Sequence, residues 1–389
     1  MYLVVCLFLA VLLVFIADRV VGFLLPDADF PWNGVASVPC EDKSIDFYDF
    51  QYTCSTNSMG LRDAEVGREK KAALRIAAIG DSYTFGWGVD LKDAWVKRVE
   101  RTLREGGLDV EIINCGKPAA GPLDYVPLAE MVLCQLHPDM IIIGLLQGND
   151  LLQAVINVPE LYFPHLSRLS REWGQLWKES PPPPTQRYQQ SSETHRLYLA
   201  DVARLELGGL NPEARARYEG LDAEVRTLFL EGRINPWMIS EAVNTDGYLA
   251  PAAHLDWPET KRLIWVTGLA LQRIRKLAEK HGAQVMVVSI PTGVFDNRPF
   301  FERCKRLGFV MDPATLMSDG PDRAGRAAAE RAGVPFYEVT QAFRDRGDDP
   351  DLYFKMDNHF TSAGHALFAE KIAPFVEGEI RKLAGGDPR

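Results

Sequence analysis

Past residue 73, the hydrophobic pattern alternates between short, almost wholly apolar runs and longer amphipathic segments. The short runs predict strands at Leu74–Ile79, Val110–Asn114, Met140–Leu146, Gln284–Ile290 and Val334–Tyr337. The longer segments predict helices near 93–106, 123–136, 259–281, 321–332 and 362–383. Strands this apolar are typical of a sheet that helices cover on both faces. The alternation therefore predicts βαβ units and an α/β fold with a parallel sheet of five strands.

The alternation stops between residues 157 and 258, where no strand-like apolar run occurs. This stretch contains the four prolines 181–184, charged helical segments such as 212–231, and an aromatic part near Trp237. We interpret it as an insertion between the third and fourth strands. It follows the carboxyl end of a strand, where the ligand crevice of an open α/β sheet lies, so it is a candidate lid or substrate wall. A peripheral helical decoration is the alternative.

The N-terminal segment is strongly apolar. Tyr2 to Ala17 form an unbroken apolar run, and after Asp18 and Arg19 a second run covers Val20 to Leu25. A membrane helix needs about 20 mostly apolar residues, so this segment predicts a transmembrane anchor. A cleaved signal peptide is the alternative, but no basic residue precedes the run and no small-x-small cleavage site follows it. Basic residues ahead of the run are too few to set its orientation.

The cysteines bear on the compartment. Cys40 and Cys54 bracket a short polar and aromatic segment just after the apolar N-terminus. A disulfide between them would indicate an oxidising compartment such as a periplasm, whereas two unpaired thiols would not. Because an anchor is predicted, we expect the bridge and an extracytoplasmic, periplasmic location for the rest of the chain.

Composition and charge narrow the function classes. Of the 389 residues, 47% are hydrophobic and 25% charged, which is ordinary for globular proteins and excludes a disordered or disulfide-scaffold chain. With 43 basic and 53 acidic residues the net charge is −10. A net acidic chain without a basic block has no positive footprint for nucleic acid, so we expect no nucleic-acid partner.

These features divide the chain into segments. We expect an anchor at 1–25, an N-terminal extension at 26–73, the first part of the α/β core at 74–156, the insertion at 157–258, the second part of the core at 259–380, and a tail at 381–389.

The first predicted strand ends in Gly80-Asp81-Ser82, followed by Tyr-Thr-Phe-Gly-Trp-Gly. A serine in a glycine-flanked turn after a strand is accessible both to a substrate and to a base, as nucleophilic catalysis requires. Glycine permits the close backbone approach that such a turn needs. Taken alone, Gly-Asp-Ser is also ordinary turn and helix-capping chemistry.

Three further blocks of polar or small residues fall at loop positions on one expected edge of the sheet. The second strand leads into the small-residue turn 114–121, and the third ends in Gln147-Gly148-Asn149-Asp150. Asp357 and His359 lie in a loop before the last helix. Together these blocks would supply a nucleophile, oxyanion donors, and a base with an orienting carboxylate.

On these blocks the chain resembles the SGNH (GDSL-like) hydrolases, serine-dependent esterases and acyltransferases on a flavodoxin-like three-layer α/β/α sandwich. The matching blocks are Gly80-Asp81-Ser82, Gly148-Asn149-Asp150, and Asp357 with His359. Asn57-Ser58-Met59-Gly60-Leu61-Arg62 and the continuation of the serine block are similar to membrane-anchored bacterial members. The resemblance covers roughly 57–156 and 259–380.

The resemblance implies a catalytic Ser82, with His359 as its base and Asp357 as the residue that orients the imidazole. The spacing Asp-x-His is one residue shorter than the usual family block, so a backbone carbonyl is an alternative partner for the ring. The implied oxyanion donors are the N–H of Ser82, the N–H of Ala119 and the side-chain amide of Asn149. Ala119 stands where the family commonly has glycine, and a shifted turn using Gly121 is the alternative.

The function implied is a serine esterase that acts on ester-linked acyl groups, acetyl above all, of an envelope or extracellular glycan or lipid. Alternatives are an O-acyltransferase of exopolysaccharide with the same chemistry, and a catalytically idle binding or assembly module. His, Cys and carboxylate residues show no metal-ligand spacing, and the turn at 80–88 has no P-loop lysine. We expect no cofactor and no metal, and the sequence does not indicate the oligomeric state.

Overall fold

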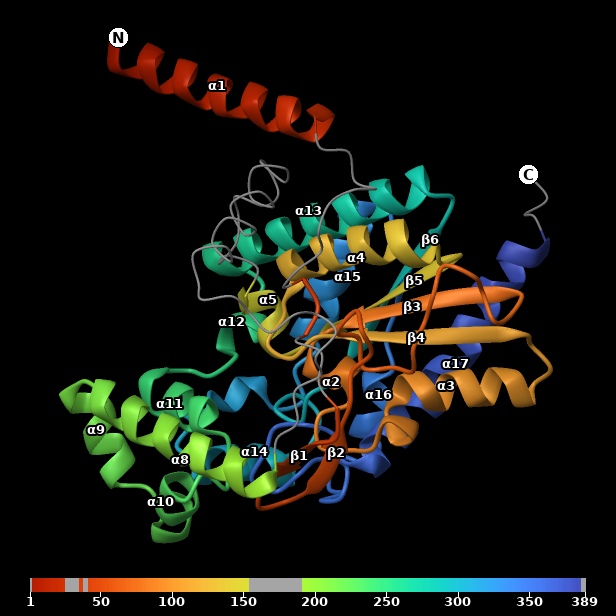
Figure 1. The fold of residues 1–389 in the computed structure, drawn as a ribbon. Coiled ribbons are helices and arrows are strands. Elements are labelled where there is room, and N and C mark those ends of the chain that lie inside the picture. The colour runs from red at the N-terminus through yellow and green to blue at the C-terminus, as the bar shows by residue number, and fades with distance from the viewer. Residues whose placement is uncertain (1, 25–34, 38–40, 154–190, 386–389) are drawn as a thin grey trace.

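The computed structural model describes residues 2–24, 35–37, 41–153 and 191–385, and its arrangement is shown in Figure 1. The core elements are β3 (Leu74–Gly80), α2 (Ser82–Phe85), a 3₁₀ turn η2 (Leu91–Asp93), α3 (Trp95–Glu105), β4 (Val110–Gly116), α4 (Pro122–Leu136), β5 (Met140–Leu146), α5 (Asn149–Gln153), α13 (Pro258–Lys280), β6 (Gln284–Ile290), α14 (Arg298–Arg306), a 3₁₀ turn η3 (Pro313–Thr315), α15 (Gly320–Ala332), β7 (Phe336–Tyr337), α16 (Thr340–Arg344) and α17 (Ser362–Gly385).

The central sheet confirms the predicted fold class. Its five strands are all parallel and lie in the order β4-β3-β5-β6-β7. Renumbered along the chain, this is the order 2-1-3-4-5 of flavodoxin-like folds. The strand order reverses beside β3, so the carboxyl ends of β3 and β5 flank the crevice where such folds bind ligands.

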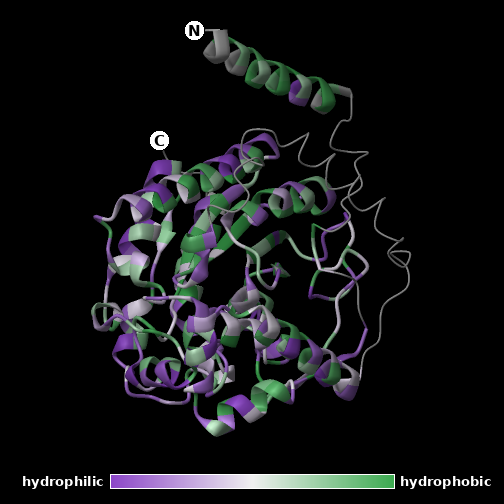
Figure 2. Cartoon of the chain, turned by 90° about the vertical axis from the view of Figure 1, so that its left-hand side faces the viewer, coloured by the Kyte–Doolittle hydropathy of each residue, from purple (hydrophilic) through white to green (hydrophobic). Residues whose placement is uncertain are grey.

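Helices cover both faces of the sheet, as the apolar strands predicted. On one face, Ala77 and Ile79 pack with buried residues of α4, α13 and α15. On the other, Ile76 and Ala78 pack with residues of α3 and α17. Figure 1 shows these two groups of helices on opposite sides of the strands. Figure 2 shows hydrophobic residues along the central strands and hydrophilic ones on the outer helices.

The described part of the insertion is helical, and most of its buried hydrophobic residues belong to the same hydrophobic cluster as Ile76 and Ala78 of β3. This part contains α8 (Ser192–Gly209), α9 (Pro212–Glu219), α10 (Ala223–Leu230), α11 (Pro236–Asn244) and α12 (Ala250–Ala253). The proline run 181–184 lies outside the described residues. Figure 1 places α8 to α11 together below the sheet.

Some predicted boundaries differ from those observed. The fifth strand was expected at Val334–Tyr337, but β7 pairs only through Phe336 and Tyr337. The last helix continues to Gly385, so the segment expected as a tail from 381 begins as helix. Cys40 lies outside the described residues, and the bridge to Cys54 stays a prediction.

The apolar N-terminal segment forms α1 (Tyr2–Leu24). Over the part of the chain that the structure describes, no helix reaches the combination of length and apolar character needed to cross a membrane.

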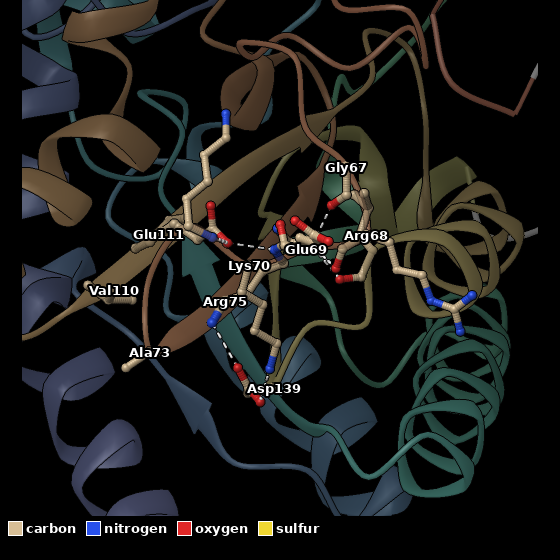
Figure 3. Close-up of polar contacts among 12 residues, drawn as sticks. Gly67, Arg68, Glu69, Lys70, Ala73, Arg75, Val110, Glu111 and Asp139 are labelled. Carbon is tan, nitrogen blue, oxygen red and sulfur yellow. Dashed lines mark hydrogen bonds and ion pairs between the residues drawn. The ribbon is translucent and has the colours of Figure 1, made fainter.

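The N-terminal extension packs against the core. It forms a hairpin of β1 (Lys43–Asp46) and β2 (Gln51–Cys54). Near its end, the buried guanidinium of Arg75 binds the extension to the sheet, as Figure 3 shows. Arg75 Nε donates to Glu111 Oε1 at 2.7 Å, and its other nitrogens donate to the carbonyls of Gly67 (2.8 Å), Glu69 (2.6 Å) and Leu136 (2.6 Å). These contacts compensate the burial of the charge, which is otherwise costly.

Three glycines lie in register at the carboxyl ends of adjacent strands. Gly80 of β3 is opposite Gly116 of β4 and Gly144 of β5. A Cβ at Gly80 or Gly144 would collide with the Thr84 side chain, and one at Gly116 would collide with the Phe85 backbone nitrogen. The absence of side chains at these positions therefore lets α2, which begins at Ser82, lie directly on the sheet.

This close approach predicts the effect of adding one methyl group. Gly116→Ala should lower the free energy of unfolding by about 1–3 kcal/mol, because the new Cβ meets backbone that can move only by displacing α2. The measurement is denaturant unfolding. The control is Gly378→Ala in α17, where a Cβ has open space and the change should stabilise the helix by about 0.5–1 kcal/mol. If the two variants had the same free energy of unfolding, the close contact between α2 and the glycines of the sheet would be contradicted.

Candidate active site

Ser82 stands at the reversal point of the sheet. It is the first residue of α2, immediately after β3, and Asp81 before it caps this short helix by accepting the Tyr83 N–H at 2.9 Å. The serine hydroxyl therefore lies at the crevice beside β3 and β5, at the end of the first core strand as the sequence predicted.

His359 reaches this hydroxyl from the far end of the chain. Its Nε2 lies 2.6 Å from Ser82 Oγ, within hydrogen-bond distance. Its Nδ1 bonds Asp357 Oδ1 on the other side of the ring. The side chain of His359 keeps 15% of its surface exposed and that of Asp357 only 4%. The structure thus brings together, in one line of contacts, the three residues predicted to be nucleophile, base and orienting carboxylate.

The short Asp-x-His spacing is compatible with this geometry. Asp357 Oδ1 accepts the backbone N–H of His359 at 3.1 Å as well as the ring contact. An aspartate that accepts the N–H two residues ahead forms an Asx turn, which holds the carboxylate beside the following side chain. The carboxylate, rather than a backbone carbonyl, is therefore the partner of the imidazole Nδ1.

Ala119 is the residue whose N–H is predicted to be an oxyanion donor. This residue has φ +61°, a left-handed conformation that favours glycine, and it lines the same cavity as Ser82. Gly121, the alternative, is committed elsewhere, since its N–H donates to Asp124 Oδ2 at 3.0 Å at the start of α4. Asn149, the first residue of α5, also lines this cavity. All five predicted site residues, Ser82, Ala119, Asn149, Asp357 and His359, therefore border one space.

Two residues of the N-terminal extension make contacts beside the site that the sequence did not predict. The first is Arg62, which is buried behind the nucleophile turn. Its guanidinium donates to the carbonyls of Phe85 (2.8 Å), Gly86 and Val89 (2.6 Å). It also lies over the rings of Tyr52 and Phe85, at 5.0 and 4.8 Å from their centroids. Arg62 thus holds the backbone just after Ser82 in place.

The second is Asp49, in the hairpin loop. Its carboxylate accepts the backbone N–H of Met356, next to Asp357. Burial raises the pKa of the Asp49 carboxyl to about 6, opposed by its hydrogen bond from Met356. Beside it, the rings of Phe50 and Phe354 have centroids 4.6 Å apart. The hairpin therefore supports the loop that carries both the carboxylate and the base.

Two buried carboxyls, Asp81 and Asp150, lie next to Ser82 and Asn149 in the sequence. Burial raises the pKa of Asp81 to about 6, opposed by the nearby His359. Asp150 accepts from Tyr125 Oη at 2.8 Å and from the Leu146 N–H at 2.9 Å, and burial raises its pKa well above the usual range. These two carboxyls therefore hold protons more tightly than exposed ones, and Asp150 fixes the end of β5 next to Asn149.

A second histidine, His365 in α17, is a packing residue. His365 is fully buried and its Nδ1 accepts the Trp95 N–H at 3.3 Å. Burial lowers its pKa to about 3, so the ring is neutral and is far from any role as a second base at ordinary pH. Within the described ranges, no group of three or more His, Cys, Asp or Glu side chains has an arrangement suited to a metal ion.

The cavity in front of Ser82 has a volume of about 860 Å³. It is lined by the core residues already named, by α8 and α11 of the insertion, and by the hairpin. The lining residues from the insertion and the hairpin include His195, Tyr198, Trp237, Glu241, Lys43 and Phe47. The described part of the insertion therefore contributes to the wall of this cavity.

Comparisons with known proteins give structural likenesses only. Neither protein families nor curated proteins match the chain. Among solved structures it is similar to TesA (11% identity, 78% of this chain and 98% of TesA covered, TM-score 0.37) and to the psychrotrophic esterase EstA from Pseudoalteromonas sp. (9%, 79% and 98%, 0.38). It is also similar to AlinE4, an SGNH-hydrolase family esterase (14%, 80% and 98%, 0.33). These likenesses are distant, and what the site can do follows from its own contacts.

The contacts predict the reactivity of one hydroxyl. Ser82 should be labelled by a fluorophosphonate, because His359 can accept its proton as the hydroxyl attacks. His359→Ala should slow labelling by about 10²–10⁴-fold, the usual contribution of a general base. The measurement is the labelling rate by intact-protein mass spectrometry.

The control for this prediction is another histidine with a carboxylate partner. His254 Nε2 lies 2.9 Å from Asp312 Oδ2, outside the cavity, and His254→Ala should leave the labelling rate unchanged. Labelling of wild-type protein at a residue other than Ser82 would contradict the assignment of the nucleophile.

Proposed function

We propose that this chain is a serine-dependent carboxylic ester hydrolase of the SGNH type that works through an acyl-enzyme. One observation carries the proposal: Ser82 Oγ lies 2.6 Å from His359 Nε2, with Asp357 on the other ring nitrogen, facing a cavity of about 860 Å³. A hydroxyl, an imidazole and a carboxylate in this relation perform acyl transfer on several unrelated folds.

The reaction has two steps, acylation of Ser82 and deacylation by water. Ser82 Oγ attacks the ester carbonyl while His359 Nε2 takes its proton, and His359 then returns this proton to the departing alkoxide. A water molecule attacks the resulting acyl-serine in the same way, with His359 as base, and releases the carboxylic acid. Throughout, Asp357 holds the ring tautomer with Nε2 toward the serine.

The negative charge that develops on the carbonyl oxygen needs donors in place before the reaction. The proposed donors are the N–H of Ser82, the N–H of Ala119 and the side-chain amide of Asn149, which border the same space. The left-handed backbone of Ala119 supports this role, because it occupies the glycine-like conformation expected of a residue that turns its N–H into the crevice.

The finer part of the proposal concerns the substrate. The acyl group is acetyl, carried by an envelope or extracellular glycan or lipid. O-acyl transfer to an exopolysaccharide hydroxyl is a second candidate, because a cavity of about 860 Å³ leaves room for an acceptor in place of water. A catalytically idle module on the same fold is the outcome if no ester is turned over.

Asn149→Ala tests the oxyanion assignment. Losing one such donor should lower kcat for p-nitrophenyl acetate by about 10²–10³-fold, because the donor acts on charge that appears only in the transition state. Ser82→Ala should abolish turnover, and Asn244→Ala, an exposed asparagine outside the cavity, should leave kcat unchanged. Full activity of Asn149→Ala would show that another group binds the oxyanion, and an inactive wild-type protein would refute the esterase.

Membrane attachment is a separate part of the proposal and is supported by the apolar run at residues 2–25. The full chain should sediment with membranes and stay there after an alkaline carbonate wash. Leu9→Asp with Leu13→Asp should release it, because two carboxylates in an apolar segment oppose insertion. Leu205→Asp, which adds a carboxylate at an exposed leucine of α8, is the control and should change nothing. A soluble chain that has lost its N-terminal residues would indicate a cleaved signal peptide instead.

A further inference from the structure

We infer that the wall contributed by α8, α11 and the hairpin is a saccharide-binding subsite, so that the ester cleaved at Ser82 is carried on a sugar rather than on a lipid. This inference rests on the proposed esterase function and names its substrate class. It concerns residues of the N-terminal extension and the insertion, which lie outside the α/β core that carries Ser82 and His359.

The size of the cavity is the first argument. A volume of about 860 Å³ is near the upper end for small-ligand sites, which are about 300–1,000 Å³. An acetyl group bound at Ser82 fills only a small part of it. The remaining space extends toward the insertion and has to accommodate the alcohol part of the ester.

One face of α8 borders this space. His195 and Tyr198 are three residues apart, a spacing that places both side chains on the same side of a helix. Tyr198 is 53% exposed although it lines the cavity, so a large part of its ring is left for a ligand. His195 is only 5% exposed, its Nδ1 has no hydrogen-bond partner among the described residues, and its ring meets Phe47 edge-on at 5.7 Å.

His195 is a neutral hydrogen-bonding group at this wall. Burial, together with the smaller effect of the positive charge of Lys43, lowers the pKa of its imidazole to about 4. A neutral imidazole has one donor and one acceptor nitrogen, which matches a sugar hydroxyl better than a carboxylate or a phosphate.

The facing helix α11 presents the same combination of a ring and a polar group. Trp237 is 49% exposed, and Glu241 follows it by one helical turn on the same side. The backbone of Trp237 is fixed, because the Asn235 side chain caps the helix by accepting the N–H groups of Trp237 (3.1 Å) and Met238 (3.3 Å). The backbone that carries the indole is therefore fixed, while about half of the surface of Trp237 stays uncovered.

This chemistry distinguishes a sugar from an acyl chain. A sugar ring presents C–H faces that pack on aromatic rings and hydroxyls that both donate and accept hydrogen bonds. Lys43 on the hairpin and Glu241 on α11 both line the cavity, and a long acyl chain laid between them would remove water from two charges without replacing it. Hydroxyl groups can replace that water.

The test compares two esters with the same acyl group. Partially O-acetylated oligosaccharides probe the subsite, and p-nitrophenyl acetate probes Ser82 with a minimal alcohol. We take the ratio of kcat/KM for the acetylated oligosaccharides to kcat/KM for p-nitrophenyl acetate. Trp237→Ala and Tyr198→Ala should each lower this ratio by about tenfold or more, because each variant loses a ring that contacts the sugar. The matched control is Trp265→Ala on α13, a tryptophan 39% exposed and outside the cavity, which should leave the ratio unchanged.

Other outcomes separate this inference from the esterase proposal. Hydrolysis of p-nitrophenyl acetate and p-nitrophenyl palmitate without hydrolysis of the acetylated oligosaccharides would overturn the saccharide subsite and leave the esterase intact. An unchanged ratio in both aromatic variants, each with an unaltered melting temperature, would also overturn it. If no ester is cleaved, calorimetric binding of the deacetylated oligosaccharides to the full chain, weakened by Trp237→Ala, would still support the subsite while refuting the esterase; absence of that binding would overturn both.

Discussion

The close contact between α2 and the sheet is the constraint on which the site depends. Gly80, Gly116 and Gly144 stand side by side at the carboxyl ends of three strands, and Thr84 and Phe85 rest on them. Because no side chain separates the helix from the strands, Ser82 lies at the rim of the sheet. Its position there leaves the hydroxyl 2.6 Å from an imidazole delivered by a loop almost three hundred residues later.

Around this contact, segments outside the α/β core complete the site. A small apolar cluster joins Phe47 and Tyr52 of the hairpin, Phe85 of α2 and Leu199 of α8. The same hairpin supports the base through Asp49, while Arg62 supports the turn after Ser82. The turn after Ser82, the loop that carries His359 and helix α8 therefore all contact the N-terminal extension as well as the core.

How far the sequence predicts this structure depends on the range of the interactions. Four of the five strands are predicted almost to the residue, because strands buried on both faces have continuous apolar runs, whereas β7 pairs through only two residues and has little pattern of its own. Ser82 and Asn149 stand out in the sequence because each follows a predicted strand closely, and Asp357 and His359 because they lie close together in a loop before the last helix. The contacts of Arg62 and Asp49 are not predicted, although Arg62 belongs to the block 57–62, because an arginine that binds carbonyls and an aspartate that binds one distant N–H leave no periodic or spaced pattern. The left-handed backbone of Ala119 likewise has no signature in an alanine.

The buried guanidinium of Arg62 ties the N-terminal extension to the turn that follows Ser82. A polypeptide that began at Leu74 would contain every strand of the central sheet and all three members of the Ser-His-Asp line. It would nevertheless lack Arg62, whose guanidinium binds the carbonyls of Phe85, Gly86 and Val89. It would also lack the hairpin, which binds the loop that carries His359. Residues that lie before the first core strand therefore belong to the same structural unit as the proposed site, and a boundary drawn from strand order alone would separate Ser82 and His359 from contacts that hold their loops in place.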